Sequence, residues 1–318
     1  MKVIDHINKS DKTLFSFELL PPLKGHHING IYKTIDPLLE FNPSFINITY
    51  HQEEVVYKKH ESGLLEKKTV RKRPGTVAIS AAIKYKYPNV DVVPHLLCGG
   101  FTKEDTEYAL IDFHFLGINN ILALRGDPPK SMRTFSPEKN GHAHASDLVA
   151  QIVRMNEGKY LDEELENIAA TDFCVGVAGY PEKHIESPNL RSDLKFLKDK
   201  IDAGASYIIT QLFYDNNKYF NFVKDCRAAG IDVPIIPGLK PITTLKDMNI
   251  LPQVFNIDIP EALVKALIKC KTNDEAFQVG IEWTTAQSKE LISFGVPVLH
   301  YFTIGISENI RKIAASVF

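Results

Sequence analysis

The sequence predicts one α/β domain over residues 1–318, built as a closed (β/α)8 barrel of the TIM type. Eight short runs of β-branched and aromatic residues recur along the 318-residue chain. Most are continuously apolar, as in parallel strands that are covered on both faces. Segments with apolar residues at helical spacing lie between most of them, and no Gly/Ser-rich linker divides the chain. Eight β–α repeats favour a closed barrel over an open doubly wound sheet.

The eight expected strands, in chain order, are Leu14–Leu19, Phe45–Tyr50, Val92–Cys98, Asn120–Arg125, Phe173–Ala178, Tyr207–Gln211, Val233–Pro237 and Val298–Thr303. Residues 243–295 are too many for one helix and predict two or three, one of them starting at Pro260. The polar segment Lys130–His144 contains Pro137 and Gly141, and we expect it to be a lid or binding loop.

Composition and charge exclude several classes of protein. Lysine and arginine number 37 against 39 aspartates and glutamates, so no global field attracts nucleic acid or anionic lipid. The sequence contains no run of 18 apolar residues, so no membrane-spanning helix is expected. Four scattered cysteines without a C-x-x-C pair give neither a disulfide framework nor a zinc ribbon, so we expect a reducing, cytoplasmic compartment. The basic run from Lys67 to Arg73 is local; it is either a solvated loop or a device that steers an anionic ligand.

Polar residues gather where the expected strands end, which is where barrel enzymes place their chemistry. Glu18 ends the first strand among apolar residues, and a carboxyl in such surroundings has a raised pKa that suits a general acid. The alternative is a buried salt bridge or a helix cap. Arg125-Gly126-Asp127 follows the fourth strand, either as a turn that lets backbone approach a ligand or as a plain turn. His95 is either a ligand or a core residue.

Metal and nucleotide motifs are weak. The pairs His26-His27 and His142-Ala143-His144 lack metal-site spacing, so no metal is expected. Neither a G-x-G-x-x-G nor a Walker loop occurs, so any nucleotide must be held otherwise. Helix starts at Ser146 and at Asn189 offer free N–H groups for a phosphate.

Taken together, these segments resemble the flavin-dependent methylenetetrahydrofolate reductase family. The resemblance runs from about Phe15 to the C-terminus, and its motifs occur in order: Phe15-Ser16-Phe17-Glu18-Leu19-Leu20-Pro21-Pro22, Ala123-Leu124-Arg125-Gly126-Asp127-Pro128, Ala145-Ser146-Asp147-Leu148-Val149, Val177-Ala178-Gly179-Tyr180-Pro181, Asp202-Ala203-Gly204-Ala205 and Ile209-Thr210-Gln211-Leu212-Phe213. It implies an FAD-binding barrel that passes a hydride from NADH or NADPH through FAD to 5,10-methylenetetrahydrofolate with ping-pong kinetics. It also implies a place in one-carbon and methionine metabolism, and a homo-oligomer.

The resemblance assigns roles to single residues. Glu18 matches the proton donor, Asp127 the carboxylate near flavin and pterin, and Gln211, with Asp127, a substrate contact. Contacts to FAD would fall to Thr49, His95, Arg125, Gly126, Asp127, His144, Ala145, Tyr180, His184, Asp193 and Lys200.

The chain departs from the family pattern at three places. His144 stands where tyrosine is frequent, and Phe302-Thr303-Ile304-Gly305-Ile306 replaces Tyr-Thr-Leu-Asn-Arg. Phe196 and Asp199 stand where some bacterial members have Asn and Arg. The altered loop leaves two other functions open: another FAD-dependent barrel oxidoreductase, similar to proline dehydrogenase, and a flavin-binding subunit without catalytic activity.

Overall fold

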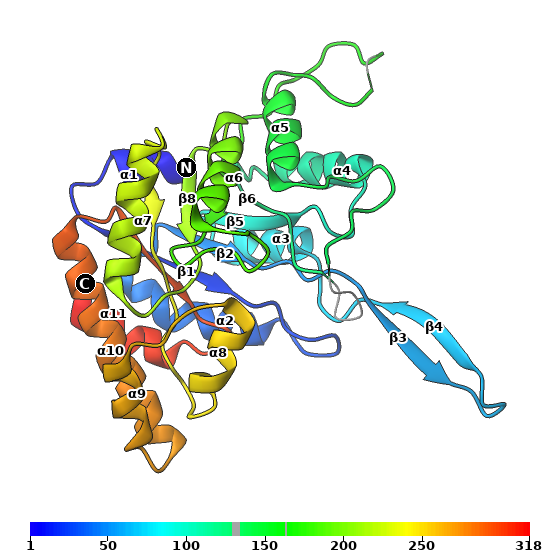
Figure 1. The fold of residues 1–318 in the computed structure, drawn as a ribbon. Coiled ribbons are helices and arrows are strands. Elements are labelled where there is room, and N and C mark those ends of the chain that lie inside the picture. The colour runs from blue at the N-terminus through cyan, green and yellow to red at the C-terminus, as the bar shows by residue number, and fades with distance from the viewer. Residues whose placement is uncertain (129–133, 163) are drawn as a thin grey trace.

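A computed structural model describes residues 1–128, 134–162 and 164–318. In these residues, nine strands form one parallel sheet that curls into a barrel (Figure 1). Its strands are β1 (Leu14–Leu19), β2 (Phe45–Ile48), β5 (Val92–Leu97), β6 (Asn120–Leu124), β7 (Cys174–Gly179), β8 (Tyr207–Thr210), β9 (Ile235–Ile236), β10 (Gly238–Leu239) and β11 (Val298–Phe302). Two of them, β9 and β10, together take the place of the seventh expected strand. Within the described residues, the order along the sheet is β10-β11-β1-β2-β5-β6-β7-β8-β9. Since only Pro237 separates β9 from β10, that segment joins both ends of the sheet.

The predicted barrel is therefore confirmed, and the strand bounds differ by only a few residues. The first strand matches its prediction, Leu14–Leu19, and the seventh is interrupted at Pro237, because proline has no N–H to give to a strand ladder.

Helices surround the sheet. They are α1 (Val3–Asn8), α2 (Asn29–Ile35) with a following 3-10 helix (Asp36–Phe41), α3 (Thr76–Lys86), α4 (Lys103–Phe115), α5 (Ala145–Asn156), α6 (Leu190–Asp202), α7 (Asn216–Ala228), α8 (Asp247–Phe255), α9 (Glu261–Ile268), α10 (Asn273–Phe294) and α11 (Glu308–Val317). The segment 243–295 thus holds three helices, and Pro260 precedes α9 as expected. Asn189 caps α6 by accepting a hydrogen bond from the Ser192 N–H at 2.9 Å. No helix in the described part of the chain is long and apolar enough to cross a membrane.

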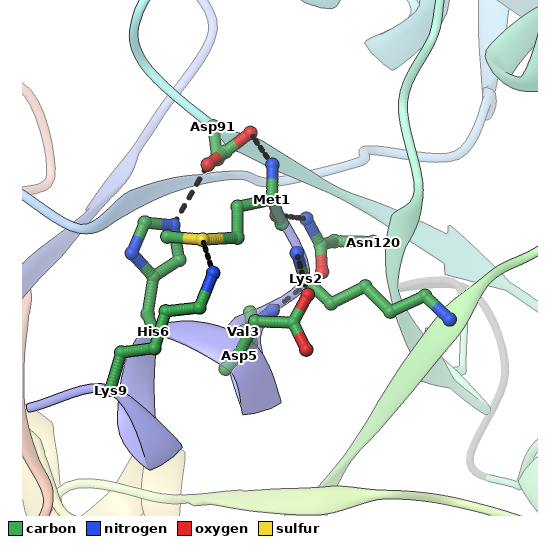
Figure 2. A network of polar contacts seen from close by, with 8 residues as sticks. All are labelled: Met1, Lys2, Val3, Asp5, His6, Lys9, Asp91 and Asn120. Carbon is green, nitrogen blue, oxygen red and sulfur yellow. Dashed lines mark hydrogen bonds and ion pairs between the residues drawn. The ribbon is translucent and has the colours of Figure 1, made fainter.

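The amino-terminal end of the barrel is closed by α1. Val3 packs against inward-facing apolar residues of the strands, including Phe45 and Val298. The backbone N–H of Val3 donates to Asn120 Oδ1 at 2.9 Å, and the Met1 ammonium and His6 both contact Asp91 (Figure 2). Since this end is plugged, a ligand must enter from the opposite end, at the carboxyl termini of the strands.

The basic run from Lys67 to Arg73, for which a solvated loop was one interpretation, lies partly in a strand. It forms most of β4 (Leu65–Val70), which pairs with β3 (Glu54–Lys59) in an antiparallel hairpin that projects beyond the end of β2 (Figure 1). Lys67 and Lys68 are exposed on it. The expected lid Lys130–His144 falls partly outside the described residues, which resume at 134.

Candidate functional site

Glu18 lies near the carboxyl end of β1 and points into the barrel, where it meets His95 of β5. Glu18 Oε2 and His95 Nε2 are 3.3 Å apart, and their side chains are 17% and 7% exposed. Burial raises the pKa of the Glu18 carboxyl to about 8 and lowers the pKa of His95 to about 3. At neutral pH the contact therefore joins a carboxylic acid to a neutral imidazole and is not an ion pair. A carboxyl that keeps its proton at neutral pH has the property that a general acid requires.

The backbone around Glu18 is tied to its neighbours on both sides. Thr303 Oγ1, which follows β11, donates to the Glu18 carbonyl at 2.6 Å. Thr49 Oγ1, which follows β2, donates to the Leu19 carbonyl at 3.2 Å. These bonds fix the end of β1 between two adjacent strands, so the direction of the Glu18 side chain is set by the sheet.

The turn Arg125-Gly126-Asp127 carries the second carboxyl past the end of β6. Gly126 has φ +86°, a conformation that suits glycine. The Arg125 guanidinium lies 2.6 Å from Glu186 and 4.9 Å from the centre of the Phe135 ring. Gln52 Nε2 donates to the Asp127 carbonyl at 2.9 Å. Glu18 and Asp127 therefore lie at the same, carboxyl end of the barrel, from strands β1 and β6.

A third group of predicted residues lies beyond β7. Asp193, in the first turn of α6, accepts hydrogen bonds from the His184 N–H at 3.1 Å and from Ser187 Oγ at 2.7 Å. The rings of Tyr180 and His184 meet edge to face with centroids 4.7 Å apart. Burial lowers the pKa of His184, and the nearby Arg125 guanidinium lowers it further. The structure brings these groups together through α6 and the β7–α6 loop.

Lys200, on the last turn of α6, reaches back to the same end. Its Nζ donates to the Ala178 carbonyl at 2.5 Å, and burial lowers its pKa to about 8. A partly desolvated ammonium beside a strand end is a suitable contact for a phosphate, because an anion there repays part of the cost of burial.

Gln211 and His144 touch none of the other predicted site residues through a hydrogen bond within the part of the chain that the structure describes. Gln211 Oε1 accepts from the Leu212 N–H at 2.9 Å, and Gln211 lines a shallow hollow with Tyr180, Pro181 and Phe255, the last residue of α8. His144 is exposed at the start of α5, where its carbonyl accepts from Cys98 Sγ at 3.4 Å, and Ala145 begins that helix. A larger cavity of about 400 Å³ lies at the opposite, plugged end, beside Lys2 and Phe173, away from every predicted site residue.

Sequence reasoning missed two residues of the barrel interior. Asn47 of β2 and His300 of β11 are completely buried, and Asn47 Nδ2 lies 3.3 Å from His95 Nε2. His300 Nδ1 lies 2.8 Å from Ser16 Oγ. Each is a polar residue inside an otherwise apolar strand, which is a pattern that could have identified them. Among the described residues, no group of three or more His, Cys, Asp or Glu is arranged to hold a metal ion.

Comparison with known proteins decides the family. The family model for methylenetetrahydrofolate reductase matches residues 2–317. This chain belongs to the methylenetetrahydrofolate reductase family. It is 32% identical over 295 residues to 5,10-methylenetetrahydrofolate reductase of Escherichia coli, covering 92% of this chain and 86% of that protein.

Longer members of the family are also similar. Methylenetetrahydrofolate reductase (NADH) 1 of Arabidopsis thaliana is 34% identical over 97% of this chain, which spans only 49% of that relative. Thus the chain spans about half the length of these curated relatives. A solved structure of an uncharacterized protein from Clostridium thermocellum, which binds two copies of 5-methyl-5,6,7,8-tetrahydrofolic acid, aligns over 99% of this chain with a TM-score of 0.58 and 15% identity. At that identity, the likeness bears on the barrel fold alone.

Proposed function

We propose that this chain is a flavoenzyme that reduces 5,10-methylenetetrahydrofolate to 5-methyltetrahydrofolate with NADH or NADPH, by ping-pong kinetics, in one-carbon metabolism. The observation that carries the proposal is the Glu18 carboxyl, which is 17% exposed and lies 3.3 Å from His95 at the open end of a barrel of this family, with a pKa that burial raises to about 8. Reduction of a methylene bridge to a methyl group needs both a hydride and a proton, and Glu18 has a proton to give at neutral pH.

The side chains at the carboxyl end fit FAD. Lys200 and Arg125 offer positive charge for a pyrophosphate, and α5 and α6 begin at the carboxyl end of the barrel with free backbone N–H groups. Thr49, His95, Gly126, Asp127, His144, Ala145, Tyr180, His184 and Asp193 would supply the remaining contacts. Bound FAD supplies the transfer of a hydride between nicotinamide and folate.

The chain's own residues would do the acid and electrostatic work. Glu18 protonates the folate so that its five-membered ring opens to an iminium cation, the group that is reduced. Asp127 at the same end stabilises that cation electrostatically. Gln211 contacts the folate, and its present contact with the Leu212 N–H must be exchanged for the ligand.

The test separates the two half-reactions of the purified holoprotein. We expect a yellow protein whose flavin is reduced by NADH or NADPH and reoxidised by methylenetetrahydrofolate. Glu18→Gln should retain the rate of flavin reduction and lose folate-dependent reoxidation by a factor of at least about 100. In the wild type, reoxidation should fall as pH rises through about 8, because Glu18 then loses its proton.

Glu157→Gln is a matched control, since this carboxyl lies on the surface at the end of α5. It should leave both half-reactions unchanged. A colourless protein that takes up no FAD contradicts the whole proposal, and equal loss of both half-reactions in Glu18→Gln contradicts the role of Glu18.

One observation favours a second candidate. The loop after β11 exposes two apolar side chains, Ile304 and Ile306, at 46% and 43%, and Ile304 has φ +45°. Such a rim suits either a different, less polar substrate, as in another FAD-dependent barrel oxidoreductase, or a second protein that a non-catalytic flavin subunit would bind. Screening electron donors and acceptors distinguishes the first, and activity that depends on an added protein distinguishes the second.

A further inference from the structure

The ring nitrogen of His95 that faces Glu18 also faces Asn47. Glu18 Oε2 and Asn47 Nδ2 each lie 3.3 Å from His95 Nε2. The three residues come from β1, β2 and β5, which are neighbours in the sheet, with Glu18 paired in register with Asn47. Asn47 is fully buried and His95 is 5% exposed, so the contact between these two residues is shielded from solvent.

Donor and acceptor roles at His95 Nε2 depend on the tautomer of the ring, and the Asn47 amide is the neighbouring group that can select it. With Nδ2 toward the ring, an N–H points at Nε2, so Nε2 must be the bare nitrogen that accepts and Nδ1 carries the hydrogen. A bare Nε2 has one lone pair, which the Asn47 N–H and the O–H of a protonated Glu18, both 3.3 Å away, then share in a three-centre hydrogen bond. It repels a carboxylate at the same position, because two acceptors then face each other.

The opposite tautomer would reverse this preference. If Nε2 carried the hydrogen, it would donate to a Glu18 carboxylate and favour loss of the acid proton. That hydrogen would also meet the N–H of Asn47. The amide of Asn47 therefore opposes the tautomer that stabilises ionised Glu18.

Two other titratable groups, His51 and His300, lie near Glu18, Asn47 and His95, and neither reverses the effect of the His95 tautomer on Glu18. His51 lies on the solvent side and lowers the pKa of His95 after burial, and His300 lies deeper in the barrel, where burial lowers its own pKa to about 3. A neutral His300 is held by Ser16. The charge on Glu18 is thus set by burial and by the hydrogen that His95 presents or withholds.

We propose that Asn47 is a positioning residue for the acid at position 18: its amide N–H locks His95 in the tautomer with a bare Nε2, and Glu18 keeps its proton until a substrate takes it. This inference rests on the proposed role of Glu18 as the acid. It adds a residue that neither touches the substrate nor lies at the rim.

The test measures the ionisation of Glu18 directly and does not depend on turnover. Infrared difference spectra of the folded protein against Glu18→Gln isolate the carbonyl band of the neutral Glu18 carboxyl. In the wild type that band should disappear with a midpoint near pH 8. In Asn47→Leu, which preserves shape and removes the N–H, the midpoint should fall by about one pH unit or more. In Asn47→Leu, nitrogen NMR of His95 should show the ring hydrogen moving to Nε2 as Glu18 ionises.

The direction of the change separates the tautomer lock from a general effect of polarity. Leucine makes the surroundings more apolar, which alone raises the pKa of a carboxyl, so an unchanged or higher midpoint overturns the proposal. Thr284→Val is the matched control, because Thr284 Oγ1 in α10 is also buried without a partner among the described residues. An equal fall in that variant also overturns the proposal.

If Asn47→Leu does not fold, Asn47→Ala removes the same N–H with less bulk, and the same fall is expected. A protein that shows the shift but reduces no folate refutes the proposed function and leaves the tautomer lock standing. A protein that reduces folate but shows no shift refutes the tautomer lock and leaves the proposed function standing.

Discussion

Replacing Glu18 by glutamine should stabilise the folded protein at alkaline pH while it abolishes the acid. A carboxyl whose pKa is higher in the folded than in the unfolded chain binds a proton more tightly when folded. Stability is therefore lost as pH rises from the unfolded pKa, about 4.5, to the folded pKa, about 8, and is then constant. Glutamine has a similar shape, can donate to His95 and never ionises, so the variant lacks this loss.

The magnitude follows from the two pKa values. Each pH unit between 4.5 and about 8 costs about 1.4 kcal/mol, so ionising Glu18 in the fold costs about 5 kcal/mol in total above pH 8. Between pH 5.5 and pH 8.5 the wild type should lose ~3 kcal/mol relative to Glu18→Gln. That is a large part of the total stability of a typical protein, ~5–15 kcal/mol.

The assay is urea unfolding of both apoproteins at several pH values, followed by circular dichroism. The difference between the two unfolding free energies removes the contributions of all other titrating groups, His95 among them. A difference that stays constant from pH 5.5 to 8.5 would refute the argument, since it would mean that Glu18 has the same pKa in the folded and unfolded chains.

Two further predictions concern packing in the helices and the charge of the β3–β4 hairpin. Gly280→Ala in α10 should destabilise the fold by about 2 kcal/mol in urea unfolding, because its Cβ would lie 2.0 Å from the Ile242 carbonyl oxygen, a cost that exceeds the ~1 kcal/mol gain in helix propensity. Gly30→Ala in α2, where a Cβ meets nothing within 4 Å, should instead stabilise slightly, and the same sign for both would contradict this account. Changing Lys67 and Lys68 of the β3–β4 hairpin to glutamate should slow stopped-flow association of NADH or NADPH several-fold at low salt and have little effect at high salt, if the hairpin steers anionic ligands. Equal rates at all salt concentrations would leave these lysines as a solvated surface.

The barrel could be predicted from the sequence because its strands are buried on both faces. A run such as Val92–Leu97 is buried along its whole length, and segments with helical spacing lie between most of the runs, so local pattern and global fold agree. The β3–β4 hairpin could not be predicted this way. Its strands are largely exposed, so they bury no face that would impose an apolar pattern, and their lysine content is typical of a solvated loop.

The common end of the barrel at which the candidate site residues lie could also be predicted, but not the contacts among them. Strand ends of a parallel barrel share one edge, and this places Glu18 and Asp127 at the same end whatever the details. The partner of Glu18 depends on the register among β1, β2 and β5, which is set by backbone pairing across residues up to 77 positions apart, as between Glu18 and His95. Nothing in the local sequence specifies that register.

The same register places Asn47 directly beside Glu18 and His95, which its position in the sequence does not indicate. A polar residue in a buried strand costs stability unless it is paired, and Asn47 satisfies only one side of its amide, since Oδ1 has no partner among the described residues. An apolar residue at this position would satisfy the fold better. The amide is therefore better explained by its proposed effect on His95 than by packing. An unsatisfied amide oxygen and a carboxyl whose pKa is raised to about 8 both cost stability at the same end of one sheet, and this cost fits the proposed role of Glu18 as an acid.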